Sequence, residues 1–217
     1  MATFTPQDVI TEVRGAIQDS KGPGYRYDDP TILRAFNHCL KRIALMRPDL
    51  FSYVTAFTTV LGTVQTMPAD SIRIVDILQV AGGGNVNEVN RATLDLAYST
   101  WQAGSTGPTT DWMRHVRSPS IFFVYPPAPA GEVLTIEYAQ SPPNYTMNQT
   151  VAVISDAYFP VLVDCVVWWM ESYDNESVAN QRAQMFQQSW TQLLGISAQT
   201  KPVTDTEASG QDPKKVI

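Results

Sequence analysis

The residues that could carry acid–base or metal chemistry are few: two histidines, His38 and His115, and one acid in an apolar segment, Asp164. No second histidine lies near His38, and no acid lies four residues before or after it. Two histidines are also too few for a typical histidine-rich metal site. Although His38 could act as a ligand or a base, we expect a surface histidine or one with satisfied hydrogen bonds. We predict no metal and no cofactor.

Asp164 interrupts the longest apolar run of the sequence, Phe159 to Met170. Carboxylates in such surroundings sometimes serve as catalytic acids. However, the sequence contains no G-x-S-x-G, Walker or H-E-x-x-H motif that would supply a nucleophile, a phosphate cradle or a zinc site. We therefore favour pairing of Asp164 with a cation or a helix-end amide, within the chain or between subunits. We predict that the protein is not an enzyme.

Two further patterns resemble binding sites but have structural explanations. Three glycines at 82–84 suggest a phosphate cradle, yet no helix with a Lys-Ser/Thr pair follows them, so we interpret residues 82–90 as a loop. Asp28 and Asp29 are adjacent carboxylates in front of Pro30. We interpret Asp29 as a helix N-cap with Pro30 as the first helical residue, which leaves Asp28 in solvent.

Aromatic residues are frequent between residues 51 and 153 and could form a platform for sugar binding. Alternation along strands turns about half of the side chains inward, so packing in a core is the simpler explanation. These residues are Phe57, Trp101, Trp112, Phe122, Phe123, Tyr125 and Tyr138.

The only cysteines, Cys39 and Cys165, form no C-x-x-C motif and no disulfide framework. We expect both to be buried thiols in a reducing compartment.

Helical signals surround a β-rich middle. Thr5 is a predicted N-cap with Pro6 in the first turn, and a turn at 21–24 ends that helix. A second amphipathic helix precedes Pro48. Strand-like segments follow. We expect a hairpin around Gly62 and further strands in 71–80, 111–117, 120–127 and 132–143. A short helix, capped by Thr93 and carrying Trp101, is expected between the strands in 71–80 and 111–117.

Helical patterns return at Ser155 and continue to a stop at Gly195, with Asn175 as the predicted cap of the last helix. We therefore predict an α+β fold: a mainly α-helical four-helix bundle with a β-rich subdomain inserted between its second and third helices, and an extended tail. The predicted parts are a first helical pair at 1–50, the insert at 51–153, a second helical pair at 154–195 and a flexible tail at 196–217.

Composition narrows the function. The chain has 217 residues, 44% of them hydrophobic, and a formal net charge of −6. An acidic chain is poorly suited to clamping nucleic-acid phosphates. The first ten residues lack the features of a signal peptide, and the longest apolar run falls short of the roughly 20 residues that span a membrane. We expect no membrane association.

The predicted helix at 156–173 is apolar on nearly every face, so it is either buried all round or partly covered by a second subunit. Trp168 and Trp169 point about 100° apart on such a helix. One of them can fill the core while the other reaches outward. We predict a subunit interface at Asp164, Trp168 and Trp169.

Three stretches resemble one family. They are GYRYDDPTILRAFNHCLKRIALMRPDLF, DWMRHVRSPSIFFVYPPAPAGEVLTIEYAQSPP and ISDAYFPVLVDCVVWWMESYD. Their order and spacing are similar to bacteriophage head-to-tail adaptor proteins, also called tail tubular protein A-like. The chain departs from that pattern at Cys165, where an aromatic residue is common, and at Trp168 and Trp169, where a Tyr-Arg pair is more usual.

The resemblance implies a structural virion protein at the head–tail junction. Such proteins form a dodecameric ring between the portal protein and the tail nozzle protein, and DNA passes through the lumen without sequence-specific binding. The basic edge of the second predicted helix is then expected to face an acidic neighbour. The alternatives are a carbohydrate-binding or tail-fibre-associated module that uses the aromatic block, and a small hydrolase that uses Asp164.

The polar segment 196–217 has almost no large apolar side chains and is expected to be flexible. It nevertheless ends with two cations and two β-branched residues, which suit an acidic, grooved partner. We predict docking on the portal through it; the alternative is a solvated tail with no role. The docking residues are Pro202, Val203, Lys214, Lys215, Val216 and Ile217.

Overall fold

The computed structural model describes residues 4–19, 26–172 and 177–195, with the side chains of 177–180 left out. The helices are α1 (Pro6–Ile17), α2 (Asp29–Met46), α3 (Arg91–Ala97), α4 (Phe159–Ser172) and α5 (Ser177–Leu193), with 3-10 turns η1 (Pro48–Phe51), η2 (Trp101–Ala103) and η3 (Asp156–Tyr158). The strands are β1 (Ser52–Thr58), β2 (Gly62–Thr66), β3 (Ser71–Val80), β4 (Gly84–Asn85), β5 (Asn87–Glu88), β6 (Asp111–Arg114), β7 (Ile121–Ala128) and β8 (Val133–Gln140).

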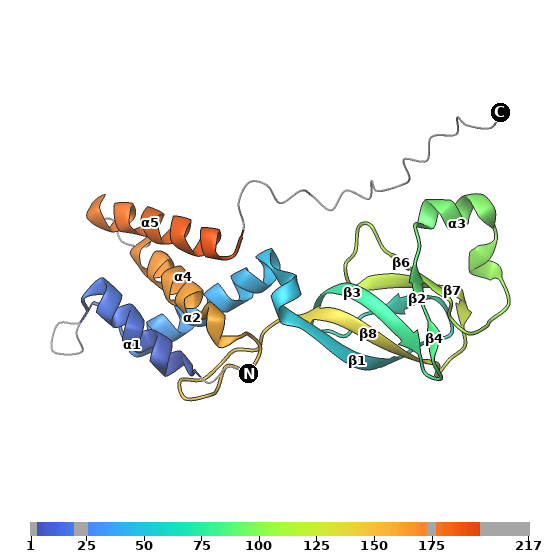
Figure 1. The fold of residues 1–217 in the computed structure, drawn as a ribbon, viewed down its shortest axis with the longest axis horizontal. Coiled ribbons are helices and arrows are strands. Elements are labelled where there is room, and N and C mark those ends of the chain that lie inside the picture. Colours follow the sequence, from blue (N-terminus) through green and yellow to red (C-terminus); the bar gives the residue numbers. More distant parts are fainter. Residues whose placement is uncertain (1–3, 20–25, 173–176, 196–217) are drawn as a thin grey trace, which may run out of the picture.

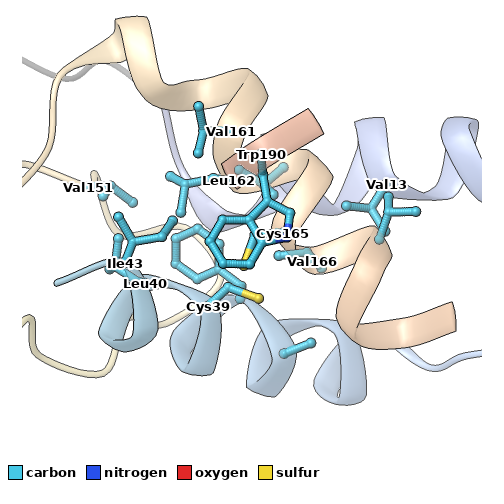
Figure 2. Close-up of a cluster of buried hydrophobic side chains, with 14 of the residues drawn as sticks. Val13, Cys39, Leu40, Ile43, Val151, Val161, Leu162, Cys165, Val166 and Trp190 are labelled. Carbon is cyan, nitrogen blue, oxygen red and sulfur yellow. The ribbon is translucent and has the colours of Figure 1, made fainter. Parts of the chain in front are cut away.

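The molecule is elongated, with α1, α2, α4 and α5 at one end and the two sheets, together with α3, at the other (Figure 1). The predicted β-rich middle between the second helix and the last helices is confirmed. At the helical end, α4 contacts α1, α2 and α5, and these four helices share one hydrophobic core. Trp190 of α5 lies in this core beside Cys39 of α2 and Cys165 of α4 (Figure 2).

The start of α1 is as the sequence predicts. Thr5 accepts a hydrogen bond from the backbone N–H of Asp8, and the Asp8 carboxylate accepts one from the backbone N–H of Thr5 at 2.7 Å. Two N–H groups that the helix itself leaves unpaired are thereby satisfied. Hydrogen bonds from the backbone and hydroxyl of Thr5 lower the pKa of Asp8.

The predicted cap of α2 is wrong by one residue. Asp28 is the N-cap, and its carboxylate accepts a hydrogen bond from the backbone N–H of Thr31 at 2.9 Å. Asp29 is the first helical residue, and its carboxylate binds Arg14 of α1. The neighbouring helix therefore decides which of the two acids caps, because Arg14 holds Asp29 away from the capping position.

Two four-stranded sheets form the other end, with strand orders β1-β8-β3-β4 and β2-β7-β6-β5. Their facing sides enclose a second core. Its buried residues are Met67, Ile74, Ile77, Val86, Trp112, Phe122, Val124, Ala128, Leu134, Ile136 and Tyr138.

The predicted hairpin around Gly62 is wrong. β1 pairs with β8 and β2 pairs with β7, so the chain crosses from one sheet to the other between them. The Gln65 side chain holds this crossing, because it accepts from the backbone N–H of Val60 and donates to the carbonyls of Val60 and Gly62. Gly62 has a φ of 110°, which disfavours residues with a side chain.

The segment after β3 also differs from the prediction in detail. The predicted loop at 82–90 contains the short strands β4 and β5. Asn90, and not Thr93, caps α3 through a hydrogen bond from the backbone N–H of Ala92 at 2.8 Å. Trp101 lies outside α3, in η2, where it packs against Phe123.

Within the described residues, no helix combines the length and the apolar character that crossing a membrane requires.

Candidate functional site

Helix α4, which carries the predicted interface residues, is the central helix of the helical end. It contacts α1, α2 and α5, so its apolar character on nearly every face has an explanation within one chain. Its buried residues are Val161, Leu162, Cys165, Val166, Val167, Met170 and Glu171.

Asp164 finds its partner within the chain. Its carboxylate accepts a hydrogen bond from the Ser189 hydroxyl of α5, with an oxygen–oxygen distance of 2.5 Å. The partner is therefore a hydroxyl, and not the cation or helix-end amide that the sequence suggested. This hydrogen bond ties α4 to α5.

Trp168 and Trp169 are both half-buried and turn to different neighbours. The Trp168 ring lies 5.8 Å from that of Trp190, and the Arg42 guanidinium lies 4.6 Å above Trp168. The Trp169 ring stacks on exposed His38 of α2, at 5.2 Å and an interplanar angle of 10°. Trp168 thus packs between Trp190 of α5 and Arg42 of α2, whereas Trp169 contacts His38 on the α2 surface.

The sequence analysis missed one buried acid in α4. Glu171 lies 3.7 Å from the Arg182 guanidinium of α5 and has no hydrogen-bond partner among the described residues. Arg182 also donates to the carbonyl of Ala16 in α1 at 2.8 Å. These contacts join three helices. No periodic signal marks Glu171, because its burial follows from the position of α1 and α5.

The remaining polar residues that drew attention in the sequence have structural surroundings. His115 accepts hydrogen bonds at Nδ1 from the backbone N–H groups of Arg117 and Ser118, which shapes the turn before β7. Across residues 4–19, 26–172 and 177–195, no three His, Cys, Asp or Glu side chains come close enough to hold a metal ion.

Burial explains most of the aromatic residues in the β-rich part. Trp101, Trp112, Phe122, Phe123 and Tyr138 are buried in its cores, and Phe57 packs against Phe122 with ring centres 5.4 Å apart. The expectation that these rings form a core is confirmed, and a sugar platform built from them is not supported.

Cys39 and Cys165 are free and buried, as expected. Burial raises the pKa of the Cys39 thiol well above its ordinary range, and the adjacent Cys165 adds to that rise. The predicted docking residues at 202–217 lie outside the described residues.

A comparison with protein families identifies the chain. The model of the SU10 adaptor protein family matches residues 4–212, which is nearly the whole sequence. The chain therefore belongs to the SU10 adaptor protein family, and it is a phage adaptor protein, as the three sequence stretches indicated. A comparison with curated proteins gave no match.

Proposed function

We propose that the protein forms a ring, expected to be a dodecamer, that joins the portal protein of the capsid to the tail nozzle protein in the virion. In this proposal the viral genome passes through the lumen of the ring, and the protein has no catalytic role. The family match over residues 4–212 is the observation that carries the proposal, because an adaptor function is structural and virion-associated.

The shape of the chain supports a joining role. A protein that connects two partners needs two separate surfaces, and the four-helix end and the two sheets lie at opposite ends of this molecule (Figure 1). The connection between them is well anchored: after β8 the chain returns along the helices, where Met147 accepts from the backbone of Gln7 and Val151 donates to Phe4. In this view residues 1–50 and 154–195 act as one four-helix bundle and 51–153 as its insert.

The surface of the helical end supports lateral contacts between copies. Leu45 near the end of α2 is 68% exposed, and Leu193 at the end of α5 is 56% exposed. These two helix ends are adjacent, because Arg47 donates to the carbonyl of Leu194. Exposed apolar side chains of this kind are favourable when a second subunit covers them.

Charge supports passage of DNA without capture. A net charge of −6 disfavours persistent contact with a polyanion, whereas proteins that hold duplex DNA neutralise many phosphates with Lys and Arg. Sequence-specific contacts are not needed for a channel.

Mass measurement tests this function. The purified protein, alone and mixed with rings of the cognate portal protein, is examined by native mass spectrometry and electron microscopy. The proposal expects a closed ring and a stable complex of ring on portal. A protein that stays monomeric, does not bind the portal protein and instead binds glycans would support the carbohydrate-binding alternative.

A further inference from the structure

One pocket of the helical end has the composition of an anion site. It measures about 290 Å³ and is lined by Arg34, Asn37, His38 and Lys41 of α2 and by Asn144 from the segment after β8. Two of these side chains, those of Arg34 and Lys41, are cations. None of the lining residues is an acid.

The cations of this pocket are held in place by neutral groups. Lys41 donates to the side-chain carbonyl of Asn144 at 2.7 Å, and Arg34 donates to the Thr31 hydroxyl at 2.9 Å. Neither cation forms an ion pair with a carboxylate among the described residues; Asp28 interacts with Arg34 only through the longer-range attraction of their charges. Both charges therefore remain available to an incoming anion.

The other side chains of the pocket are held in place by hydrogen bonds and ring stacking. Asn37 donates to the carbonyls of Leu33 and Tyr145 and accepts from the backbone N–H of Tyr145. His38 is stacked against Trp169. Little ordering of these side chains would be needed on binding, and preorganisation of this kind favours affinity.

The charge distribution of the chain indicates where the anion comes from. Residues 30–48 contain four of the 15 Lys and Arg residues and none of the 21 Asp and Glu residues. The remainder of the chain therefore carries all of the negative surplus. When identical subunits meet head to tail in a ring, a basic face on one copy lies against a different face of the next. Outside residues 30–48 the chain has 21 Asp and Glu residues against 11 Lys and Arg residues.

We propose that this pocket receives carboxylate side chains of the neighbouring copy, so that it orients adjacent subunits in the ring; this inference rests on the ring-forming function proposed above. A protein carboxylate suits the pocket better than DNA does. The cations are confined to one concavity, whereas duplex DNA is bound by cations spread along many phosphates. Complementary charges across an interface also fix its register.

Charge reversal tests the pocket. The double variant Arg34→Glu/Lys41→Glu is compared with Arg73→Glu/Arg117→Glu, which reverses two exposed cations of the β-rich part. We expect the protein concentration at half-assembly, measured by sedimentation, to rise by at least about tenfold for the pocket variant, because like charges then meet across the interface. The control should stay within about twofold, since charges outside an interface contribute little.

Folding is checked separately. Circular dichroism and urea unfolding should match the wild type; if the double reversal does not fold, Arg34→Gln/Lys41→Gln serves in its place and should give a smaller shift in the same direction. Pocket variants that assemble like the wild type overturn the inference and leave the ring function intact. So do variants that assemble normally but lose binding to portal rings or to a DNA duplex, which would assign the pocket to that partner. A wild-type protein that forms no ring overturns both proposals.

Discussion

Arg14 of α1 donates two hydrogen bonds to one carboxylate oxygen of Asp29, the first residue of α2. The donors are Nη2 at 2.6 Å and Nε at 3.2 Å. The same guanidinium binds the Asp19 carboxylate at 3.0 Å and the carbonyl of Tyr27 at 2.8 Å. Asp19 in turn accepts from the backbone N–H groups of Arg26 and Tyr27. A single arginine thus connects the end of α1 to the start of α2.

Removing this arginine should weaken the fold strongly. Arg14→Met removes a guanidinium that binds two largely buried carboxylates, so we expect the free energy of unfolding in urea to fall by about 3 kcal/mol at pH 7. Arg14→Lys keeps the charge but not the forked geometry and should lose less. Equal losses for the two variants would show that the charge alone is unimportant at this position.

Trp190 and Trp169 should respond differently to truncation to alanine. Trp190 is fully buried, so Trp190→Ala is expected to lower the free energy of unfolding by about 4 kcal/mol. Trp169 is half-buried and stacks on exposed His38, so Trp169→Ala should lower monomer stability less and ring assembly more. Urea unfolding and sedimentation measure the two effects. If Trp169→Ala unfolds the monomer as much as Trp190→Ala does and leaves assembly unchanged, the interface prediction for Trp169 is wrong.

The helix caps should make the free energy of unfolding decrease as the pH falls into the acid range. Hydrogen bonds from the side chain and backbone of Thr31 lower the pKa of Asp28, and the cap at Thr5 lowers that of Asp8. A lowered folded-state pKa gives stability that is complete above about pH 5, where the unfolded-state carboxyl is almost fully ionised, and that disappears as pH falls through the folded-state pKa.

Asp28→Asn isolates one of these caps. Asparagine caps about as well as aspartate at neutral pH but does not titrate. We therefore expect nearly wild-type urea midpoints at pH 7 and a smaller drop between pH 5 and pH 3. A drop as large as in the wild type would mean that Asp28 contributes nothing to the acid sensitivity.

The cysteines should be unreactive in the folded protein. The thiolate is the reactive form, and burial, with Cys165 alongside, raises the pKa of the Cys39 thiol. Ellman's reagent at pH 8 should find no fast-reacting thiol in the native protein and two after unfolding in urea. A Ser52→Cys variant, which places a thiol at an exposed position, should gain one fast-reacting group. Rapid labelling of native wild-type protein would contradict the buried environment.

Local signals predicted the local structure well. The cap at Thr5, the helix before Pro48 and the strand at 71–80 all depend on neighbours within a few residues, and all three are present. Asp28 and Asp29 carry equivalent local signals in front of Pro30. The choice between them depends on Arg14, which lies 15 residues from Asp29.

Contacts between distant residues were not predictable in this way. The strand-like segments on the two sides of Gly62 resemble the two strands of a hairpin. Their true partners, β8 and β7, follow only much later in the chain. The candidate site shows the same limit. The sequence singled out Asp164 as an unusual acid, yet its partner Ser189 depends on how α5 crosses α4, and the pocket needs Asn144 to meet Lys41 across 103 residues.

Residues 196–217 are predicted to contribute to portal binding. This segment has few large apolar side chains, but Lys214 and Lys215 stand beside Val216 and Ile217, and a short extended segment of this kind suits an acidic groove on a partner. A chain truncated after Gly195 should bind portal rings more weakly than the full chain while it still forms rings, because it keeps every described residue of the helical core, up to Leu194. Lys214→Glu/Lys215→Glu in the full chain should reproduce part of the loss, and the loss should shrink at high salt, where the attraction between charges is screened. Undiminished portal affinity of the truncated chain in surface plasmon resonance would assign the joint to the folded body alone.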